Sequence, residues 1–273
     1  MLYTIMSVKS RNHDVRVAAV AFMFNHIHTL QEARTKTVAH GFLGDVMSVF
    51  VKQLNSDCGR VGPMFSPVDS AYKYDGKKCK DATAYLYNNS VEKKLFREAI
   101  EDRWNFLAYC QNSHPFSEQL VIRRSSRMMR KAIVMVNDFH SRSQYLNLAA
   151  LRRIFSGLGK KETEQLIDYI IVKYEFIDYA LTIRYYKDID NMLIAIDSNT
   201  GSEYEIKEGF ERISDKPIRE MCIMANRLGL LGKDMKIYSL SNEEKQRLAQ
   251  DFMGYTGASG RHAAKFFHIT SGG

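Results

Sequence analysis

The stretch AFMFNHIHTL, residues 21–30, places His26 and His28 one residue apart inside an apolar run. The residues before it, 14–24 (DVRVAAVAFMF), are rich in β-branched and aromatic side chains, and those of 26–33 (HIHTLQEA) alternate between apolar and polar. Both patterns are typical of β-strands. The sequence therefore predicts a hairpin whose two strands meet at the histidines.

The spacing of the two histidines is also compatible with metal binding. Successive side chains of a strand point to opposite faces, so His26 and His28 project to the same side and their ring nitrogens can converge on one ion. A pair of surface histidines on an exposed sheet face explains the spacing equally well. A metal site would in addition need a third ligand from elsewhere in the chain.

A candidate for that third ligand lies in AYLYNNS, residues 84–90, within a helix predicted to begin near Cys79. On a helix, Tyr85 and Asn89 are four residues apart and share one face, whereas Tyr87 is rotated to a different side. A phenol and a carboxamide would then lie on one surface. The alternative is that Tyr85 is an ordinary core residue and Asn89 an ordinary residue of a helix surface.

The rest of the chain divides by pattern and composition. Apolar residues recur at helical spacing over 34–55, whereas 64–78 (MFSPVDSAYKYDGKK) suggests an irregular strand with turn signals. Beyond Phe116 the sequence becomes helical and basic. We therefore predict one domain over 1–115 and a mostly helical C-terminal region over 116–273.

Charge favours a polyanionic partner. The chain has 39 Lys and Arg against 31 Asp and Glu, a net charge of +8, and its 45% hydrophobic content is that of a globular protein. The densest basic cluster is a candidate DNA-binding surface, with a solvated helix face as the alternative. It comprises Arg123, Arg124, Arg127, Arg130 and Lys131.

A second candidate for DNA binding is the C-terminal segment 242–269. It predicts a helix to about Tyr255, a turn at TGAS (256–259) and a short helix from Gly260 to His268, and it is similar to the terminal helix-turn-helix of many transposases and regulators. Three residues of the short helix would then contact DNA, namely Arg261, His262 and Lys265.

The cysteine spacing, and the lack of a leader pattern or a long apolar run, indicate the cellular compartment of the protein. The four cysteines lie far apart without a CxxC pair, which predicts neither a zinc knuckle nor a disulfide framework. No leader pattern and no apolar run of membrane-spanning length is present in the sequence. We therefore expect a cytoplasmic protein without a membrane partner.

Three motifs together resemble a known family. FMFNHIHTL, AYLYNNSVEKKLF and the segment Trp104 to Tyr109, together with the expected strand MFSPVDSAY (64–72), are similar in order and spacing to those of the HUH single-tyrosine transposases of insertion sequences and their REP-associated relatives. The resemblance covers about residues 14–110. It implies an α+β fold, with a ferredoxin-like antiparallel sheet and helices, here lacking the opening strand, followed by the helical region. The proline of the family's Asn-Pro is replaced by Ser90.

The resemblance also implies a function. Tyr85 would be the nucleophile, and His26, His28 and Asn89 would bind Mg²⁺ or Mn²⁺. The expected enzyme is a homodimeric transposase that cleaves and rejoins single-stranded DNA beside hairpins through a 5′-phosphotyrosine intermediate. Two alternatives stay open: a DNA-binding relative that no longer catalyses, and a metal phosphoesterase in which metal-bound water attacks and Tyr85 is dispensable.

Overall fold

The computed structural model describes residues 1–23, 26–59, 61–198, 216–230, 240–267 and 269. Internal contacts divide the chain into two compact units, which are treated separately below. The first contains Met1–Gln53 and Pro63–Lys207, and the second contains Leu54–Gly62 and Glu208–Gly273. The boundary predicted near Pro115 lies within the first unit.

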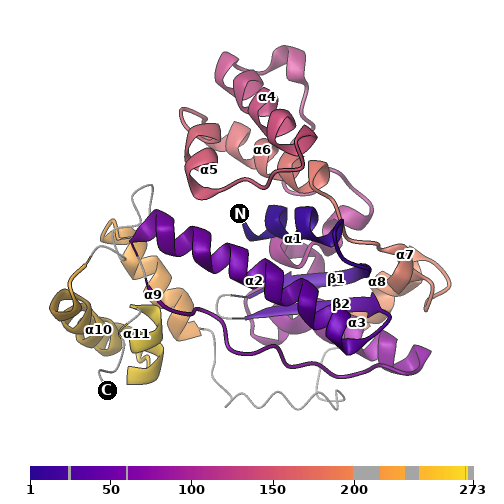
Figure 1. Ribbon diagram of the computed structural model, residues 1–273, viewed down its shortest axis with the longest axis horizontal. Helices are drawn as coiled ribbons and strands as arrows, with labels where there is room; N and C mark the ends of the chain where they lie inside the picture. Colours follow the sequence, from indigo (N-terminus) through magenta and orange to yellow (C-terminus); the bar gives the residue numbers. More distant parts are fainter. Residues whose placement is uncertain (24–25, 60, 199–215, 231–239, 268, 270–273) are drawn as a thin grey trace. The chain divides into compact units, whose positions relative to one another are not determined.

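The predicted hairpin is confirmed and lies in the first unit (Figure 1). Strand β1 (Val15–Phe22) pairs antiparallel with β2 (Ile27–Ala33), and Ala21 lies opposite His28. The register shifts between Val17 and Ala19, so β1 contains one extra residue there, as in a β-bulge. The strands therefore meet beside the histidines, as the sequence predicts.

The sheet of the described residues consists of these two strands alone, so the expected ferredoxin-like antiparallel sheet is not present among them. A short segment around Ile177 instead contacts the outer edge of β1, through one parallel bridge between Val17 and Ile177. The Asp178 amide donates to the Val17 carbonyl at 2.8 Å. The α+β prediction is thus confirmed only for the hairpin, and the structure is otherwise mostly helical.

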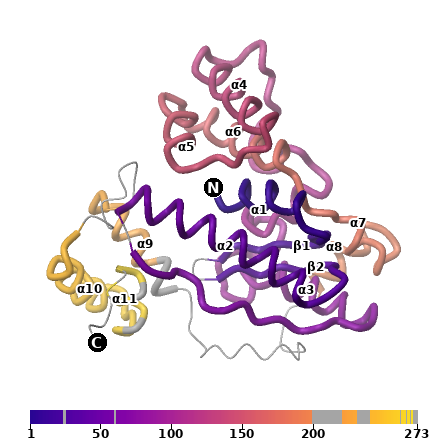
Figure 2. The backbone as a smooth tube through the Cα atoms, viewed as in Figure 1, coloured from indigo at the N-terminus to yellow at the C-terminus, as the bar shows by residue number. Residues whose placement is uncertain are grey.

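The segment 64–78, predicted as an irregular strand, has no regular secondary structure over 64–75, and 76–78 begin the next helix. Pro67 cannot donate a ladder hydrogen bond, and no bridge joins the segment to either described strand. The segment instead runs along helix α2 (Lys36–Cys58) (Figure 2). The rings of Phe50 and Phe65 lie 5.9 Å apart, and the Oγ atom of Ser70 lies 2.8 Å from a ring nitrogen of His40. The segment is therefore held against the helix by side-chain contacts.

Helix α3 (Gly76–Glu92) follows directly and contains Tyr85 and Asn89, the predicted nucleophile and the predicted third metal ligand. Its N-cap is Asp75, whose carboxylate accepts a hydrogen bond from the Lys78 amide at 2.7 Å. The helix therefore begins three residues before the predicted start at Cys79.

Helices surround the hairpin in the first unit. They begin with α1 (Leu2–Ser10) and continue after α3 with four 3₁₀ turns and five α-helices. The turns are η1 (Ala99–Glu101), η2 (Arg103–Asn105), η3 (Leu107–Cys110) and η4 (Ile122–Arg124). The helices are α4 (Arg127–Ser141), α5 (Leu148–Ile154), α6 (Lys160–Lys173), α7 (Ala180–Ile183) and α8 (Ile189–Ser198).

Strand β1 contributes residues to two hydrophobic clusters. Val17 and Val20 belong to a cluster with residues of α1, α2, α4, α5 and α6, whereas Ala19 and Ala21 belong to one with residues of α3 and α8. Because a strand buried on both faces needs apolar residues at nearly every position, the run VAAVA replaces simple alternation there.

The second unit contains the predicted helix, turn and helix. Helix α9 (Lys216–Arg227) packs with α10 (Asn242–Thr256) and α11 (Gly260–Phe266) around the buried side chains of Met221, Phe252 and Phe267. Ser241 and Glu244 form a capping box at the start of α10, and Gly257 adopts a left-handed φ of 65° after its end. The predicted order of elements is confirmed.

In the parts of the chain that the structure describes, no helix combines the length and apolarity needed to cross a membrane.

Candidate functional site

The four residues predicted as nucleophile and metal ligands lie together at one end of the hairpin. The rings of His26 and His28 are 4.7 Å apart, edge to face. From α3, the Tyr85 ring lies 5.6 Å from the His28 ring, and the Asn89 Nδ2 atom lies 3.1 Å from His28 Nε2. Two elements far apart in the sequence thus contribute to one cluster.

The rotation of α3 about its axis places Tyr85 and Asn89 beside β2. Tyr87 is fully buried among apolar residues of the cluster that contains residues of α3 and α8. The side-chain amide of Asn88 donates a hydrogen bond to the Ile196 carbonyl of α8 at 2.6 Å. These two contacts fix one face of the helix against the interior. Because Tyr85 and Asn89 are four residues apart, they share a different face, which adjoins His28.

Asn89 is buried, and one of its side-chain polar atoms has no hydrogen-bond partner among the described residues. The side chain is 1% exposed, and the atom without a partner is Oδ1. Leaving a buried carbonyl oxygen unpaired costs about 1–3 kcal/mol, so a partner such as an ion or a water molecule would stabilise it. Rotating the amide by half a turn exchanges the positions of oxygen and nitrogen without changing its shape. The oxygen would then face His28.

The residues present fit a hard divalent cation. The 3.1 Å between Asn89 and His28 is close to the separation of about 3 Å between adjacent ligands of an octahedral Mg²⁺ ion. Among the described residues, no three of His, Cys, Asp and Glu form a metal-binding group. The donor set is therefore neutral, with two imidazoles and one amide, and it would leave the charge of the cation undiminished.

A pocket of about 450 Å³ opens beside the cluster. His28 and Tyr85 both line it, and further lining residues come from β2, α2, α3 and the segment 68–73. Tyr85 is 9% exposed and lines this pocket. A substrate bound in the pocket would contact the predicted nucleophile.

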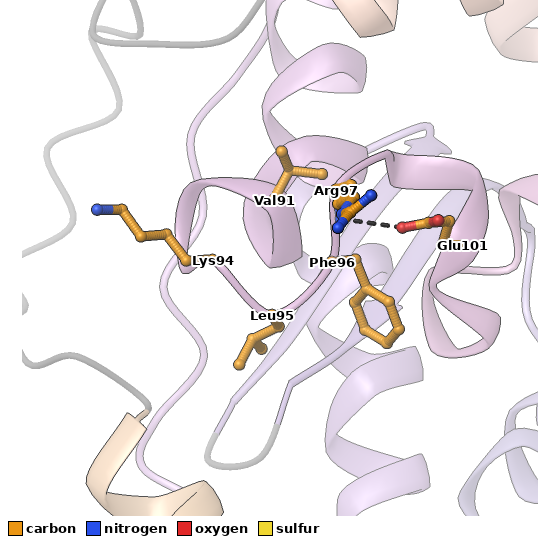
Figure 3. Close-up of a pocket in the computed structure, with 6 residues that line it drawn as sticks. All are labelled: Val91, Lys94, Leu95, Phe96, Arg97 and Glu101. Carbon is orange, nitrogen blue, oxygen red and sulfur yellow. Dashed lines mark hydrogen bonds between the residues drawn. The ribbon is translucent and has the colours of Figure 1, made fainter.

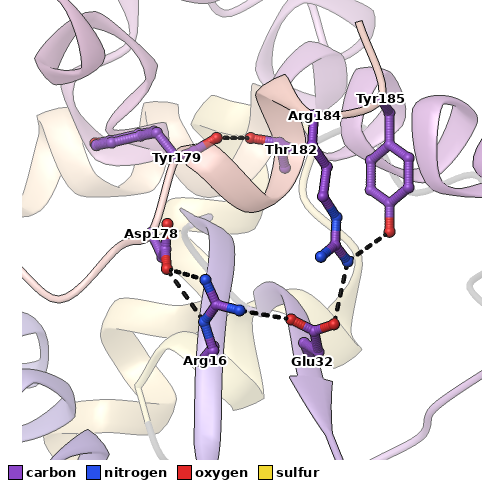
Figure 4. Close-up of polar contacts among 7 residues, drawn as sticks. All are labelled: Arg16, Glu32, Asp178, Tyr179, Thr182, Arg184 and Tyr185. Carbon is purple, nitrogen blue, oxygen red and sulfur yellow. Dashed lines mark hydrogen bonds and ion pairs between the residues drawn. The ribbon is translucent and has the colours of Figure 1, made fainter.

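A network of charged side chains ties the open ends of the two strands to the chain around α7 (Figure 4). Arg16 contacts Glu32 at 3.2 Å and Asp178 at 2.7 Å, and Arg184 donates to Glu32 at 3.1 Å and to the Tyr185 hydroxyl at 2.9 Å. Glu32, Arg184 and Tyr185 also line the pocket. Because each charge is paired with its opposite, this network serves mainly to hold the pocket wall.

A second pocket, of about 470 Å³, lies at the C-terminal end of α3 (Figure 3). The Arg97 amide donates to the Glu101 carboxylate across it at 2.9 Å. None of the predicted site residues lines this pocket, whose walls are Val91, Lys94, Leu95, Phe96, Arg97 and Glu101.

All five residues of the predicted basic cluster are exposed, from η4 into the first turns of α4. Ile122 and Met128 beside them are 46% and 41% exposed, so the surface combines charge with apolar contact area. One member, Arg130, donates to the Ser125 carbonyl at 2.5 Å. The cluster is thus open to solvent, and its contact with DNA stays a prediction.

The three predicted DNA-binding residues of the second unit lie in α11. The Oγ atom of Ser259 lies 3.0 Å from a ring nitrogen of His262 and accepts a hydrogen bond from the His262 amide, which caps the helix. The side chains of Arg261 and Lys265 lie outside the described part of the chain. Their contact with DNA stays a prediction.

Sequence reasoning did not single out Asn105, which supports the helix α3. Its side-chain amide donates to the carbonyls of Tyr87 and Ala99, at 3.3 and 2.6 Å. The Tyr87 carbonyl lies in α3 between the two functional residues, so Asn105 helps to fix their position. Its place in the segment Trp104 to Tyr109, one of the three motifs, was the available signal.

No family model, no curated protein and no solved structure matches the chain.

Proposed function

We propose that this protein cleaves and rejoins single-stranded DNA in a reaction that depends on a divalent metal ion, with Tyr85 as the nucleophile. One observation carries the proposal: Tyr85 and Asn89 of α3 lie beside the histidine pair of the hairpin, and Tyr85 and His28 line one pocket. This is the grouping expected of the HUH single-tyrosine transposases that the sequence resembles.

The proposed step is a transesterification. The Tyr85 oxygen attacks the phosphorus atom of a phosphodiester, a Tyr–O–P bond forms, and the bond from phosphorus to the 3′ oxygen breaks. The phenol loses its proton and the leaving 3′ oxygen gains one, so the products are a 5′-phosphotyrosine and a free 3′-hydroxyl. The reverse step, with the 3′-hydroxyl of another strand, rejoins DNA without ATP.

His26, His28 and Asn89 would bind Mg²⁺ or Mn²⁺. When bound, the cation would polarise the scissile phosphate and stabilise charge developing on its oxygens. The protein supplies the neutral ligands, and the buried position of Asn89 keeps its amide in place. Tyr85 is held by the same helix as Asn89, so the nucleophile and the metal site keep a fixed relation.

Unpaired DNA beside a hairpin is the proposed substrate, and a second copy of the chain the proposed partner. A net charge of +8 favours DNA, and the exposed basic cluster offers five positive side chains that could neutralise phosphates. A catalytically inactive DNA-binding protein would use the same surfaces. The two functions differ in whether a covalent product forms.

The experiment is a denaturing gel of the protein with labelled, hairpin-containing single-stranded DNA from the flanks of its own gene. We expect a covalent protein–DNA band with Mg²⁺ or Mn²⁺ and none with chelator. DNA binding without a band at any metal concentration would favour the inactive relative. Free cleaved DNA without a band, persisting when Tyr85 is replaced, would favour a metal phosphoesterase.

Two adjacent asparagines provide a matched test of the metal site. We expect Asn89→Ala to raise the metal concentration that gives half-maximal band formation by about 10-fold or more, because one ligand is lost. Asn88→Ala removes no ligand, so it should change that concentration less than Asn89→Ala does, and it should lower the free energy of unfolding by about 1–3 kcal/mol because the Ile196 carbonyl loses its buried donor. Equal metal dependence of both variants would contradict the assignment of Asn89.

A further inference from the structure

Two aromatic side chains stand out on the surface just before α3. Tyr72 is 58% exposed and Tyr74 is 80% exposed, and their rings lie 5.9 Å apart at an interplanar angle of 21°. Residues two apart on an extended chain point to the same side, which brings the two rings together. Single exposed apolar residues are common, but a stacked pair of exposed rings presents a flat aromatic surface to solvent.

The chain that carries these rings is anchored on both sides. Before them, the Oγ atom of Ser70 lies 2.8 Å from a ring nitrogen of His40 in α2. Between them, the Lys73 carbonyl accepts from the Cys79 thiol at 3.9 Å, and immediately after them Asp75 caps α3. The two rings are therefore presented from a fixed backbone, which lowers the entropy lost when a ligand binds.

The same segment borders the candidate site. Tyr72 and Lys73 line the 450 Å³ pocket that also contains His28 and Tyr85. A ligand that occupies the pocket next to Tyr85 can therefore also contact the aromatic pair.

The charges around the pair favour a polyanion. The Lys78 ammonium lies 5.7 Å from the centre of the Tyr74 ring, and Lys77 and Lys80 are exposed nearby in the sequence. The carboxylate of Asp75 is already engaged as the helix cap. Flat aromatic faces beside lysines are the surface that proteins use to stack unpaired bases while neutralising the backbone.

We infer that Tyr72 and Tyr74 form a stacking platform for unpaired bases of single-stranded DNA, next to the phosphate that Tyr85 attacks. The inference rests on the proposed function for the identity of that phosphate. The platform selects unpaired DNA, because the faces of bases in a duplex are covered by their neighbours. Tyr72 and Tyr74 are thus binding residues that position the substrate.

The test compares two double variants, Tyr72→Leu/Tyr74→Leu and Tyr72→Phe/Tyr74→Phe. The probe is a fluorescent oligothymidylate of about 16 nucleotides, the upper end of known single-strand site sizes, with chelator present to prevent cleavage. We expect the leucine variant to bind it between roughly 5-fold and 100-fold more weakly than the wild type, because stacking is lost. The phenylalanine variant should bind within about twofold, since the rings are kept.

Leucine and wild-type proteins that bind the oligonucleotide equally would overturn the inference. Both positions are exposed, and equal thermal melting curves would show that the variants fold. The platform and the proposed function can also fail separately. Weakened binding of the leucine variant, in a protein that never forms a covalent band, would support the platform and reject the nuclease. If the leucine variant binds the oligonucleotide as the wild type does and still forms the covalent band, the nuclease would be supported and the platform rejected.

Discussion

Replacing Tyr85 with phenylalanine is expected to abolish the covalent protein–DNA band, lowering its rate of formation by a factor on the order of 10⁴ or more. The substitution removes one oxygen atom and keeps the ring that contacts His28. A phenyl ring has no oxygen atom that could form the phosphate ester, so the proposed covalent intermediate cannot form at this position. DNA binding, measured by anisotropy with chelator, should remain within about twofold, since stacking and phosphate contacts are unchanged.

Tyr87→Phe is the matched control, two residues along the same helix. The Tyr87 side chain is fully buried, and its hydroxyl has no hydrogen-bond partner within the described parts of the chain. Burial raises the pKa of this phenol far above its usual range, so it stays protonated and is a poor nucleophile. We expect Tyr87→Phe to form the band normally and to be as stable as the wild type or more stable by about 1 kcal/mol. Loss of the band in both variants alike would argue against Tyr85 as the nucleophile.

Asp168→Ala is expected to lower the free energy of unfolding of the first unit by about 3–5 kcal/mol, because three hydrogen-bond donors lose a buried charged acceptor. The Asp168 carboxylate is 1% exposed and accepts hydrogen bonds from the Tyr109 hydroxyl at 2.7 Å and the Ser117 hydroxyl at 2.9 Å. It also accepts from the Phe116 amide at 3.2 Å and lies 3.5 Å from the Arg103 guanidinium.

The loss should also reach α3, because Asp168 holds the chain between η2 and Ser117 against α6. Burial and the carboxylate of Asp168 raise the pKa of Tyr109, so its phenol stays protonated and donates to that carboxylate. Asn105 in the same segment donates to the Tyr87 carbonyl of α3. Urea unfolding measures the effect, and a band assay on the folded variant should show slower cleavage.

Glu164 provides the control for this prediction. It pairs with the same Arg103 at 2.5 Å but is 35% exposed, so Glu164→Gln should cost less than about 1 kcal/mol. If Asp168→Ala were no more destabilising than Glu164→Gln, the buried carboxylate would not hold the segment as described.

Local patterns in the sequence predicted the local elements. The β-branched run and the alternation beside His26 and His28 predicted the hairpin, and the recurring apolar residues of 34–55 predicted α2. The capped start of α10 and the glycine at its end predicted the helix, turn and helix order. Each of these signals involves neighbours in the chain, and so periodicity and capping chemistry suffice.

Non-local pairing was beyond these signals. The sequence of 64–78 suggested an irregular strand, but among the described residues this segment pairs with neither strand of the sheet. Instead Tyr72 and Tyr74 are exposed side by side. The ferredoxin-like sheet followed from the family resemblance, whereas the single bridge from Val17 to Ile177 depends on where a distant segment packs.

The sequence predicted the two residue pairs of the candidate site, but it did not predict that the two pairs would lie together. Spacing placed Tyr85 with Asn89, and His26 with His28, on shared faces. Whether α3 would lie beside β2 depended on the burial of Tyr87 and on the bond from Asn88 to Ile196, which no local pattern reveals. The unpaired Asn89 oxygen is visible only once the helix is packed.

Mass spectrometry of the covalent product tests the central claim most directly. Trypsin cuts after Lys80 and Lys93, so residues 81–93 form one peptide that contains both Tyr85 and Tyr87. After nuclease trimming of the DNA, fragment ions of this peptide should carry a 5′-nucleotide on Tyr85 only when Mg²⁺ or Mn²⁺ was present. A nucleotide on another residue, or cleaved DNA with an unmodified peptide, would contradict the assignment of Tyr85 as the nucleophile.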